Sequence, residues 1–451
     1  MKKSNNKLRP VFHITGGDGW INDPNGLVVF NGRYHVFFQY NPYGTSFGAA
    51  HWGHAASVDL KHWESLPVAL APGDDGDADG CFSGSAIAHG GKLWLLYTGF
   101  TRNEGGDTER QVQCLAESVD GVNFKKCGVV IGSEQLPQEY APNDFRDPKV
   151  WRHGDKFYCV TAARKIGGGG RLLMFSSSDL TSWEFVGDLF GKDCRGKMTE
   201  CPDYRDGDGL LFMSEIAPPP DGNTHLNSST TRWFYGALDH TTGVFRVADE
   251  GICDYGFDFY APQSFADRPV MLAWMNMWGR NNPSSKYGFA GMMTVPRRIE
   301  KVDGKLVQSP IVGSREVVRK IVDDTFKDNV KTGVVDITAT GLKECEILMR
   351  KKGGAYTKLS LVGGEWVFDR SRSGEPIVGD EKDPDSLANI RRMPKLDRDK
   401  THIIIVLDEF SIEIFIDWNA LSSTVYPPLD ADELCLSVKA DACEYIRSEI
   451  V

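Results

Sequence analysis

The sequence predicts an all-β protein in which a five-bladed β-propeller, residues 1–314, precedes a β-sandwich, residues 315–451. Three observations support this fold class. A turn motif recurs about every sixty residues, short runs rich in aromatic and β-branched residues lie between its copies, and amphipathic helices are scarce. Several strands in each repeat, and closure of the repeats into a ring, are typical of a propeller.

The recurring turn motif is Ser-x-Asp followed four residues later by an aromatic residue. Three copies share this spacing and a fourth, looser copy lacks the serine: Ser57–Asp59 with Trp63, Ser118–Asp120 with Phe124, Ser177–Asp179 with Trp183, and Asp239 with Phe245. The aspartates are separated by 61, 59 and 60 residues. A region of about 300 residues with this period corresponds to five blades. Chance recurrence of a common turn is the alternative.

The repeat stops near residue 315, and the rest of the chain predicts an antiparallel sandwich. Two β-rich runs, Ile403–Leu407 and Ile412–Ile416, flank Asp408 and Glu409, and further strand-like runs lie before and after them. The Lys-, Asp- and Arg-rich stretch 379–400 is predicted to be an exposed loop.

Polar residues recur at the phase that opens each repeat. The five opening segments are Trp20–Gly26, Cys81–Ser85, Phe145–Pro148, Glu200–Asp203 and Asp258–Ala261. If this phase is the start of the innermost strand, the five segments converge on one end of the central channel. Asp23, Asp147 and Glu200 would then share one funnel.

A pair of carboxyl groups on either side of a bond is what glycoside hydrolysis requires. One carboxylate attacks or stabilises the anomeric carbon, and the other group gives a proton to the leaving oxygen. Clustering raises the pKa of one member, because like charges resist joint ionisation. Each residue also has a simpler explanation: Asp23 and Asp147 precede prolines in turns, Arg146 pairs with a structural carboxylate, and Glu200 lies on the surface.

Composition excludes several other functions. A net charge of −11 argues against nucleic acid or an anionic membrane as the partner. The N-terminus has no apolar segment behind its basic residues, and no apolar run of about 18 residues occurs, so we expect a cytoplasmic protein. The ten cysteines show no zinc spacing and predict reduced, mostly buried thiols. His51, His54 and His62 are read as structural.

These segments together resemble the signature blocks of glycoside hydrolase family 32, which contains invertases, fructanases and sucrose-6-phosphate hydrolases. The resemblance runs from about His13 to Arg298 and continues more weakly near 411–427. It implies a propeller joined to a sandwich, retention of configuration, and catalysis without a metal or organic cofactor. The segments at 79–85 and 274–278 are most similar to bacterial intracellular sucrose hydrolases.

The resemblance implies a role for each candidate residue. Asp23 corresponds to the nucleophile, Glu200 to the acid/base, and Asp147, beside Arg146, to the residue that holds fructose hydroxyls and stabilises the transition state. Other positions match the lining of the fructose pocket: Asn22, Gln39, Trp52, Phe82, Ser83, Tyr260 and Trp274. Phe47 departs from the pattern, because many members have tryptophan at this rim position. The substitution keeps an aromatic ring and removes an indole N–H.

We therefore expect hydrolysis of the terminal β-fructofuranosyl bond of sucrose, its 6-phosphate or short fructo-oligosaccharides. Fructosyl transfer to a sugar would use the same carboxylates and is the main alternative. A sugar-binding propeller without activity should have lost a working carboxylate, and the Trp20–Gly26 segment disfavours an inverting hydrolase. A phosphorylated substrate would need Lys or Arg near the glucose end of the pocket. Oligomeric state is left open.

Overall fold

In the computed structural model, 33 strands and one short 3₁₀ helix, η1 (Pro283–Tyr287), form the described chain, residues 8–74, 76–102, 109–222, 226–379 and 389–451. No α-helix occurs within these residues. The prediction of an all-β class is confirmed. No described helix combines the length and the apolar surface that a membrane crossing requires.

Five sheets, antiparallel except for one short parallel pair in the first, follow one another along the first two thirds of the chain. The first contains β1 (Gly19–Phe30), β2 (Arg33–Asn41), β3 (His51–Ser57), β4 (Glu64–Leu70) and β19 (Phe289–Ala290). The second contains β5 (Gly80–His89), β6 (Lys92–Arg102), β7 (Glu109–Ser118) and β8 (Lys125–Ile131). The third contains β9 (Tyr140–His153), β10 (Lys156–Lys165), β11 (Gly170–Ser177) and β12 (Trp183–Asp188).

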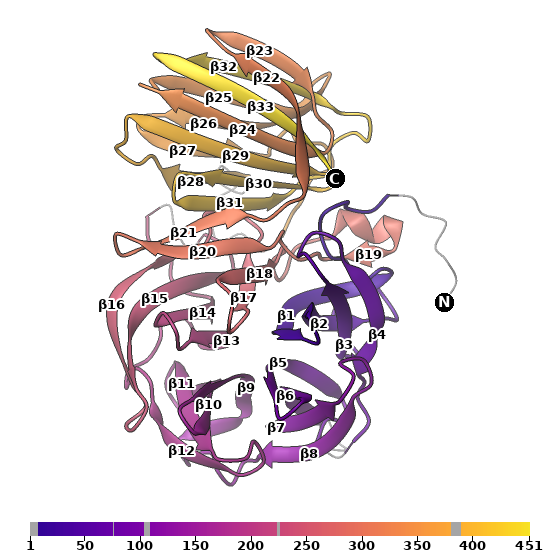
Figure 1. Ribbon diagram of the computed structural model, residues 1–451, viewed down its shortest axis with the longest axis vertical. Helices are drawn as coiled ribbons and strands as arrows, with labels where there is room; N and C mark the ends of the chain where they lie inside the picture. Colours follow the sequence, from indigo (N-terminus) through magenta and orange to yellow (C-terminus); the bar gives the residue numbers. More distant parts are fainter. Residues whose placement is uncertain (1–7, 75, 103–108, 223–225, 380–388) are drawn as a thin grey trace.

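The fourth and fifth sheets complete this part of the chain. The fourth contains β13 (Met198–Arg205), β14 (Leu210–Ile216), β15 (Ser229–Asp239) and β16 (Val244–Ile252). The fifth contains β17 (Tyr260–Ser264), β18 (Val270–Trp274), β20 (Arg297–Val302) and β21 (Lys305–Pro310). Figure 1 shows the five sheets around a common centre, with the first strand of each innermost.

The first strands close into a ring. Each of β1, β5, β9 and β13 contacts the first strand of the next sheet, and β17 contacts β1. The short strand β19 adds to this closure, because it pairs in parallel with β1 through Phe289 and Ala290. The chain therefore returns from the fifth sheet to the first.

The recurring Ser-x-Asp motif forms the same turn in three sheets, each time between the third and fourth strands. Ser57, Ser118 and Ser177 each donate a hydroxyl hydrogen bond to the aspartate two residues later. That aspartate then accepts two backbone N–H groups from the following residues. Asp239 accepts two such bonds without the serine. The periodicity in the sequence thus reflects a real structural repeat.

The remaining strands form two six-stranded antiparallel sheets that lie face to face in Figure 1. One contains β22 (Ser314–Ile321), β33 (Ala442–Ile450), β24 (Gly333–Thr340), β29 (Lys400–Asp408), β30 (Ser411–Ile416) and β31 (Asn419–Thr424). The other contains β23 (Thr325–Asn329), β32 (Glu433–Lys439), β25 (Glu344–Lys352), β26 (Ala355–Val362), β27 (Glu365–Asp369) and β28 (Ile390–Pro394). Side chains of both sheets share one apolar core.

The predicted loop 379–400 is wrong in part. Residues 380–388 lie outside the described residues, but β28 follows at Ile390–Pro394 and pairs with β27. Arg391 and Met393 are buried in this strand. The charge content of this segment indicated a loop, but its buried and less buried positions alternate, as they do in a β-strand.

A buried polar cluster joins the ring to the two six-stranded sheets, and we call it the interface cluster (His13, Asp254, Arg297, Asp408 and Glu413). Arg297 contacts Glu413 at 2.6 Å and Asp254 at 3.0 Å, and His13 contacts Asp408 at 2.7 Å and Glu413 at 3.0 Å. Burial alone would lower the pKa of His13, but hydrogen bonds to both carboxylates raise it to about 9. Opposite charges thus hold the two parts together.

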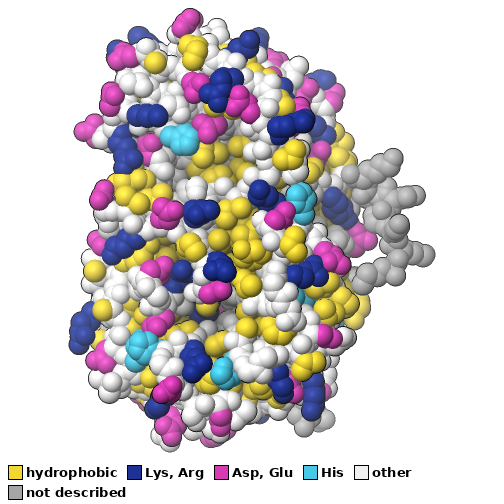
Figure 2. Space-filling model, in the orientation of Figure 1, with side chains coloured by type: hydrophobic (Ala, Val, Ile, Leu, Met, Phe, Trp, Pro, Cys, Tyr) yellow, Lys and Arg dark blue, Asp and Glu magenta, His cyan; other side chains and the backbone are white. Residues whose placement is uncertain are grey.

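On the face seen in Figure 2, acidic and basic side chains are interspersed, and hydrophobic side chains gather near the middle. The ten cysteines are free, and seven of them are buried.

His54 is buried against His35, with 2.9 Å between His35 Nδ1 and His54 Nε2. Burial lowers the pKa of His54 to about 3, so this pair is a neutral core contact, in agreement with the structural reading.

Candidate active site

The five first strands all carry the same irregularity. Pairing with the second strand breaks register after Ile21, Phe82, Arg146, Glu200 and Tyr260, and β1 and β9 each have a second break. Such bulges redirect side chains and are frequent beside active sites. The residues of the predicted phase lie at or next to these breaks.

Three of the bulges share an unusual backbone conformation. Asp147, Cys201 and Ala261 have φ values of 64°, 47° and 50°, and a proline follows each of them. Positive φ is uncommon for residues other than glycine and costs about 1–3 kcal/mol where it is maintained. The fold therefore holds these positions under strain, and the strain directs the neighbouring side chains inward.

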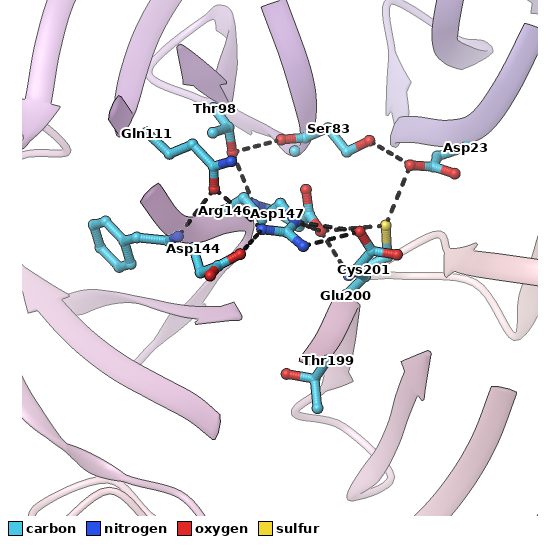
Figure 3. Close-up of polar contacts among 12 residues, drawn as sticks. Asp23, Ser83, Thr98, Gln111, Asp144, Arg146, Asp147, Thr199, Glu200 and Cys201 are labelled. Atoms are coloured by element: carbon cyan, nitrogen blue, oxygen red, sulfur yellow. Dashed lines mark hydrogen bonds and ion pairs between the residues drawn. The ribbon is translucent and has the colours of Figure 1, made fainter. Parts of the chain in front are cut away.

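The three predicted carboxyl groups meet in one place (Figure 3). Cys201 Sγ lies 3.5 Å from Asp23 Oδ2 and 3.6 Å from Asp147 Oδ2, so one thiol contacts both carboxylates. Arg146 joins Glu200 to the group, with its Nε and NH2 nitrogens 3.2 and 3.1 Å from Glu200 Oε1. We call Asp23, Asp144, Asp147 and Glu200, with Arg146, the carboxylate cluster.

Specific donors position each carboxylate. The Ser83 hydroxyl donates to Asp23 Oδ2 at 2.7 Å, and the Cys201 backbone N–H donates to Asp147 Oδ2 at 2.9 Å. The Tyr260 hydroxyl donates to Glu200 Oε2 at 2.6 Å. Glu200 thus lies between a guanidinium group and a phenol, and its two oxygens have different partners.

Burial dominates the electrostatics of the cluster. Burial, followed by the charge of Glu200, raises the pKa of Asp23 to about 6. Burial also raises the pKa of Asp147 to about 7; the charge of Arg146 lowers this pKa, and the charges of Glu200 and Asp23 raise it. Burial and Glu200 raise the pKa of Tyr260, which therefore remains a hydrogen-bond donor. Two acids with raised pKa values in one cavity indicate a functional site.

The cavity beside the cluster has a volume of about 340 Å³. It is lined by Asn22, Asp23, Gln39, Ser83, Asp147 and Glu200. The other lining residues are Phe47, Phe82, Phe100, Arg102, Glu109, Gln111, Asn143, Asp144, Arg146 and Trp278, and we call the four on β6 and β7 (Phe100, Arg102, Glu109 and Gln111) the outer wall. A space of this size with aromatic walls and convergent polar groups suits a small polar molecule.

Residues 13–310 match the family described as "Glycosyl hydrolases family 32 N-terminal domain". The chain belongs to glycoside hydrolase family 32. The resemblance that the sequence motifs indicated is thereby confirmed, and the protein is a glycoside hydrolase.

Curated relatives of this family 32 enzyme match over most of their length. A Bacillus subtilis protein named "Sucrose-6-phosphate hydrolase" is 38% identical and covers 93% of this chain and 89% of the relative. An Escherichia coli "Raffinose invertase" is 35% identical over 96% of this chain and 92% of the relative.

Solved structures give the same result. A Bombyx mori GH32 beta-fructofuranosidase, determined as a mutant in complex with sucrose, has a TM-score of 0.84 at 28% identity and covers 99% of this chain and 94% of that one. A Lactobacillus gasseri sucrose-6-phosphate hydrolase has a TM-score of 0.89 at 24% identity, over 99% and 94% of the two chains, and supports the fold.

Most of the predicted site residues line the cavity of the family 32 enzyme, but Trp52, Tyr260 and Trp274 do not. Trp52 is fully buried, and its indole N–H donates to the Phe82 carbonyl at 3.0 Å. Trp274 is also fully buried and packs against Trp20 and Trp278. These residues support the wall from behind, and Tyr260 reaches the cluster through its hydroxyl group. The roles assigned to the site residues stay predictions.

Trp278 is relevant to Phe47, which stands where many members of the family have a tryptophan at the rim of the pocket. It lies beside Phe47, with ring centroids 5.5 Å apart, and stacks on Trp20 at 6.1 Å. Phe47 is half exposed, as expected at a rim. An indole is therefore still present beside the phenyl ring, although it comes from a distant segment of the chain.

Sequence reasoning missed the outer wall of the cavity. Phe100, Arg102, Glu109 and Gln111 lie on β6 and β7, where Phe100 pairs with Gln111 and Arg102 with Glu109. They occupy second and third strands and therefore fall outside the phase that was searched. Cys201 was also missed, although it follows Glu200 directly.

Proposed function

We propose that the chain is a retaining β-fructofuranosidase that hydrolyses the terminal fructosyl bond of sucrose, its 6-phosphate or short fructo-oligosaccharides. One observation carries the proposal. Asp23, Asp147 and Glu200 come from three different sheets, and their side chains meet around Cys201 and Arg146 at one cavity. The carboxylate pair of a glycosidase requires such convergence.

The arrangement of the sheets supports a more specific architecture than the all-β class alone. We infer that the ring of five sheets is a five-bladed β-propeller comprising residues 1–314, and that residues 315–451 form a β-sandwich. The fifth sheet ends with β21 at Pro310 and the first strand of the six-stranded pair, β22, begins at Ser314, which supports this division.

In the first step, the Asp23 carboxylate attacks the anomeric carbon of fructose, and Glu200 gives its proton to the glycosidic oxygen. Ser83 holds one Asp23 oxygen, and Arg146 and Tyr260 fix the Glu200 carboxyl group. A retaining enzyme requires the two groups about 5–5.5 Å apart. Glu200 then acts as a base on the water that releases fructose from Asp23, and configuration is retained.

Asp147 has a different task. Its position is fixed by the backbone N–H of Cys201 and by its own backbone N–H, which donates to Thr98 Oγ1 at 2.8 Å. A fixed carboxylate beside the reacting centre can accept sugar hydroxyl groups and stabilise the positive charge of an oxocarbenium-like transition state. Its neighbour Arg146 orients Glu200.

The substrate class is supported by relatives named "Sucrose-6-phosphate hydrolase" and "Raffinose invertase" and by a structural neighbour determined in complex with sucrose. Transfer of fructose to a second sugar would use the same residues, and analysis of the products at high sucrose distinguishes it. A cytoplasmic location, action without a metal or cofactor, and the absence of nucleic-acid or membrane partners stay predictions.

The test is the turnover of sucrose followed by NMR. Hydrolysis with retention should give β-fructofuranose as the first anomer, before it equilibrates. Because the pKa of Asp23 is about 6, kcat/KM should fall as the pH drops below about 6, where the nucleophile gains a proton. Release of the opposite anomer, or no release of fructose from any of the three substrates, would refute the proposal.

A further inference from the structure

We propose that the cavity selects uncharged sugars and rejects their phosphate esters, so that free sucrose or a neutral oligosaccharide is used in preference to sucrose 6-phosphate. The inference rests on the proposed function and narrows its substrate class. It follows from the charges on the cavity wall and from the partners of the cations there.

Carboxyl groups outnumber cations around the cavity. Among the described residues that line it, five carry carboxyl groups and two carry guanidinium groups: Asp23, Glu109, Asp144, Asp147 and Glu200, against Arg102 and Arg146. No lysine is among these described lining residues.

Arg146 is largely committed to protein partners, because four of its five N–H groups donate to Glu200, Asp144 and Gln111. Its guanidinium group contacts Glu200 and Asp144 at 3.1 Å each and lies 4.0 Å from Asp147. Gln111 Oε1 accepts a further hydrogen bond from its NH1 nitrogen at 3.2 Å. A phosphate at this position would have to displace the carboxylates that the reaction uses.

Arg102 is the remaining cation, and it is paired at the mouth of the cavity. Its Nε lies 3.4 Å from Glu109 Oε1, and its guanidinium group lies over the Phe100 ring at 5.1 Å. Both side chains of the ion pair are substantially exposed, at 56% for Arg102 and 43% for Glu109. A phosphate that approaches Arg102 therefore meets the Glu109 carboxylate on the same wall.

The other outer residues suit a neutral sugar. Phe82 stacks on Phe100 at 4.4 Å, and Phe47 meets Trp278 edge to face at 5.5 Å. Gln111 and Asn143, which have amide side chains, also line the cavity. Aromatic faces and amides bind apolar sugar surfaces and hydroxyl groups without requiring a charge on the ligand.

The size of the effect follows from the charge of the ligand. A phosphate monoester carries about −1.5 to −2 at pH 7, and several like charges within one cavity act on it together. We expect kcat/KM for sucrose to exceed that for sucrose 6-phosphate by about tenfold or more at low ionic strength. The ratio should shrink as added salt screens the exposed charges.

The experiment compares the two substrates at about 20 mM and about 300 mM salt, in the wild type and three variants. Glu109→Gln should raise the ratio of kcat/KM for sucrose 6-phosphate over sucrose by about threefold or more. Arg102→Gln leaves the Glu109 carboxylate unpaired and should lower that ratio by a similar factor, about threefold, without abolishing turnover of sucrose 6-phosphate. Glu117→Gln is the matched control, since it alters the same strand where Glu117 pairs with Lys92 at 2.6 Å, and it should leave the ratio unchanged.

The outcomes separate the two proposals. Equal or better turnover of sucrose 6-phosphate by the wild type, or collapse of its turnover in Arg102→Gln, would overturn the selection of neutral sugars and leave the fructosidase assignment intact. Failure of the folded wild type to hydrolyse sucrose, its phosphate and short fructo-oligosaccharides would instead refute the assignment on which the inference rests.

Discussion

Two buried groups of charged side chains in this molecule differ in how their charges are matched. In the interface cluster, Arg297 and His13 lie between the carboxylates of Asp254, Asp408 and Glu413. In the carboxylate cluster, Arg146 contacts three of the four acids and Arg164 contacts Asp144 at 2.6 Å, whereas Asp23 has no ion-pair partner among the described residues.

The pKa values of Glu413 and Asp23 follow this difference, although burial raises the pKa of Asp254 in the interface cluster in spite of Arg297. Burial would raise the pKa of Glu413, but Arg297 and His13 lower it, whereas burial and Glu200 raise the pKa of Asp23 to about 6. Matched charges stabilise the fold, and unmatched acids are available for chemistry at a cost in stability. The comparison teaches that the balance of charge, and not burial, separates a structural cluster from a reactive one.

The largest effect is expected from removing a carboxyl group of the carboxylate cluster. Asp23→Ala and Glu200→Ala should each lower kcat on sucrose by at least about 10³-fold, because each removes a group that takes part in bond cleavage. The far-ultraviolet circular dichroism spectrum should stay that of the wild type. Near-normal turnover in either variant would show that its role is misassigned.

The next largest effect should appear in the interface cluster and affect stability instead. Glu413→Gln leaves Arg297 and His13 short of a negative charge, and the free energy of unfolding should fall by about 3–5 kcal/mol. Urea unfolding monitored by tryptophan fluorescence measures it. As a control, Glu316→Gln breaks an exposed pair with Arg319 and should leave the free energy of unfolding nearly unchanged. Equal losses in both variants would contradict the comparison.

The smallest effect has the opposite sign. An aspartate titrates near 3.9 in the unfolded chain, so a folded pKa of about 6 means that ionisation of Asp23 destabilises the native state. The destabilisation is fully present above pH 6 and is absent below about pH 4. Asp23→Asn should therefore raise the free energy of unfolding at pH 7.5 by about 1–3 kcal/mol, and the gain should fade as the pH falls from 6 to 4.

Asp120→Asn is the control for that measurement. Hydrogen bonds from Asn123 and Val122 lower the pKa of Asp120, so its charge stabilises the native state above the unfolded pKa. Loss of this charge should lower stability at pH 7.5. If Asp23→Asn also lowers the free energy of unfolding at pH 7.5, the charge of Asp23 does not destabilise the native state.

The sequence could predict the site residues on the first strand of each sheet, because a repeat places equivalent residues at equivalent positions. From the spacing of Asp23, Ser83, Asp147, Glu200 and Tyr260 it could be expected that they lie at one end of the ring. The all-β class followed from the same period. These features depend on local pattern, which a single sequence contains.

The outer wall and the interface cluster depend on pairing between distant segments, which spacing alone does not encode. Glu109 reaches the cavity because β7 pairs with β6 in a particular register, and Trp278 because its segment packs against Trp20. Arg297 and Glu413 are 116 residues apart. Charge content also misled the prediction at 390–394, where a buried strand carries two arginines.

The parallel pairing of β19 with β1 has a consequence for enzyme inactivation. The strand that contains Asp23, β1, also closes the ring of sheets. It does so by pairing with β19, where Gly19 and Trp20 lie opposite Phe289 and Ala290. Loss of this pairing would shift Asp23 while the other four sheets stayed intact. Catalysis should accordingly be lost at lower denaturant concentrations than those that melt the bulk of the β-structure.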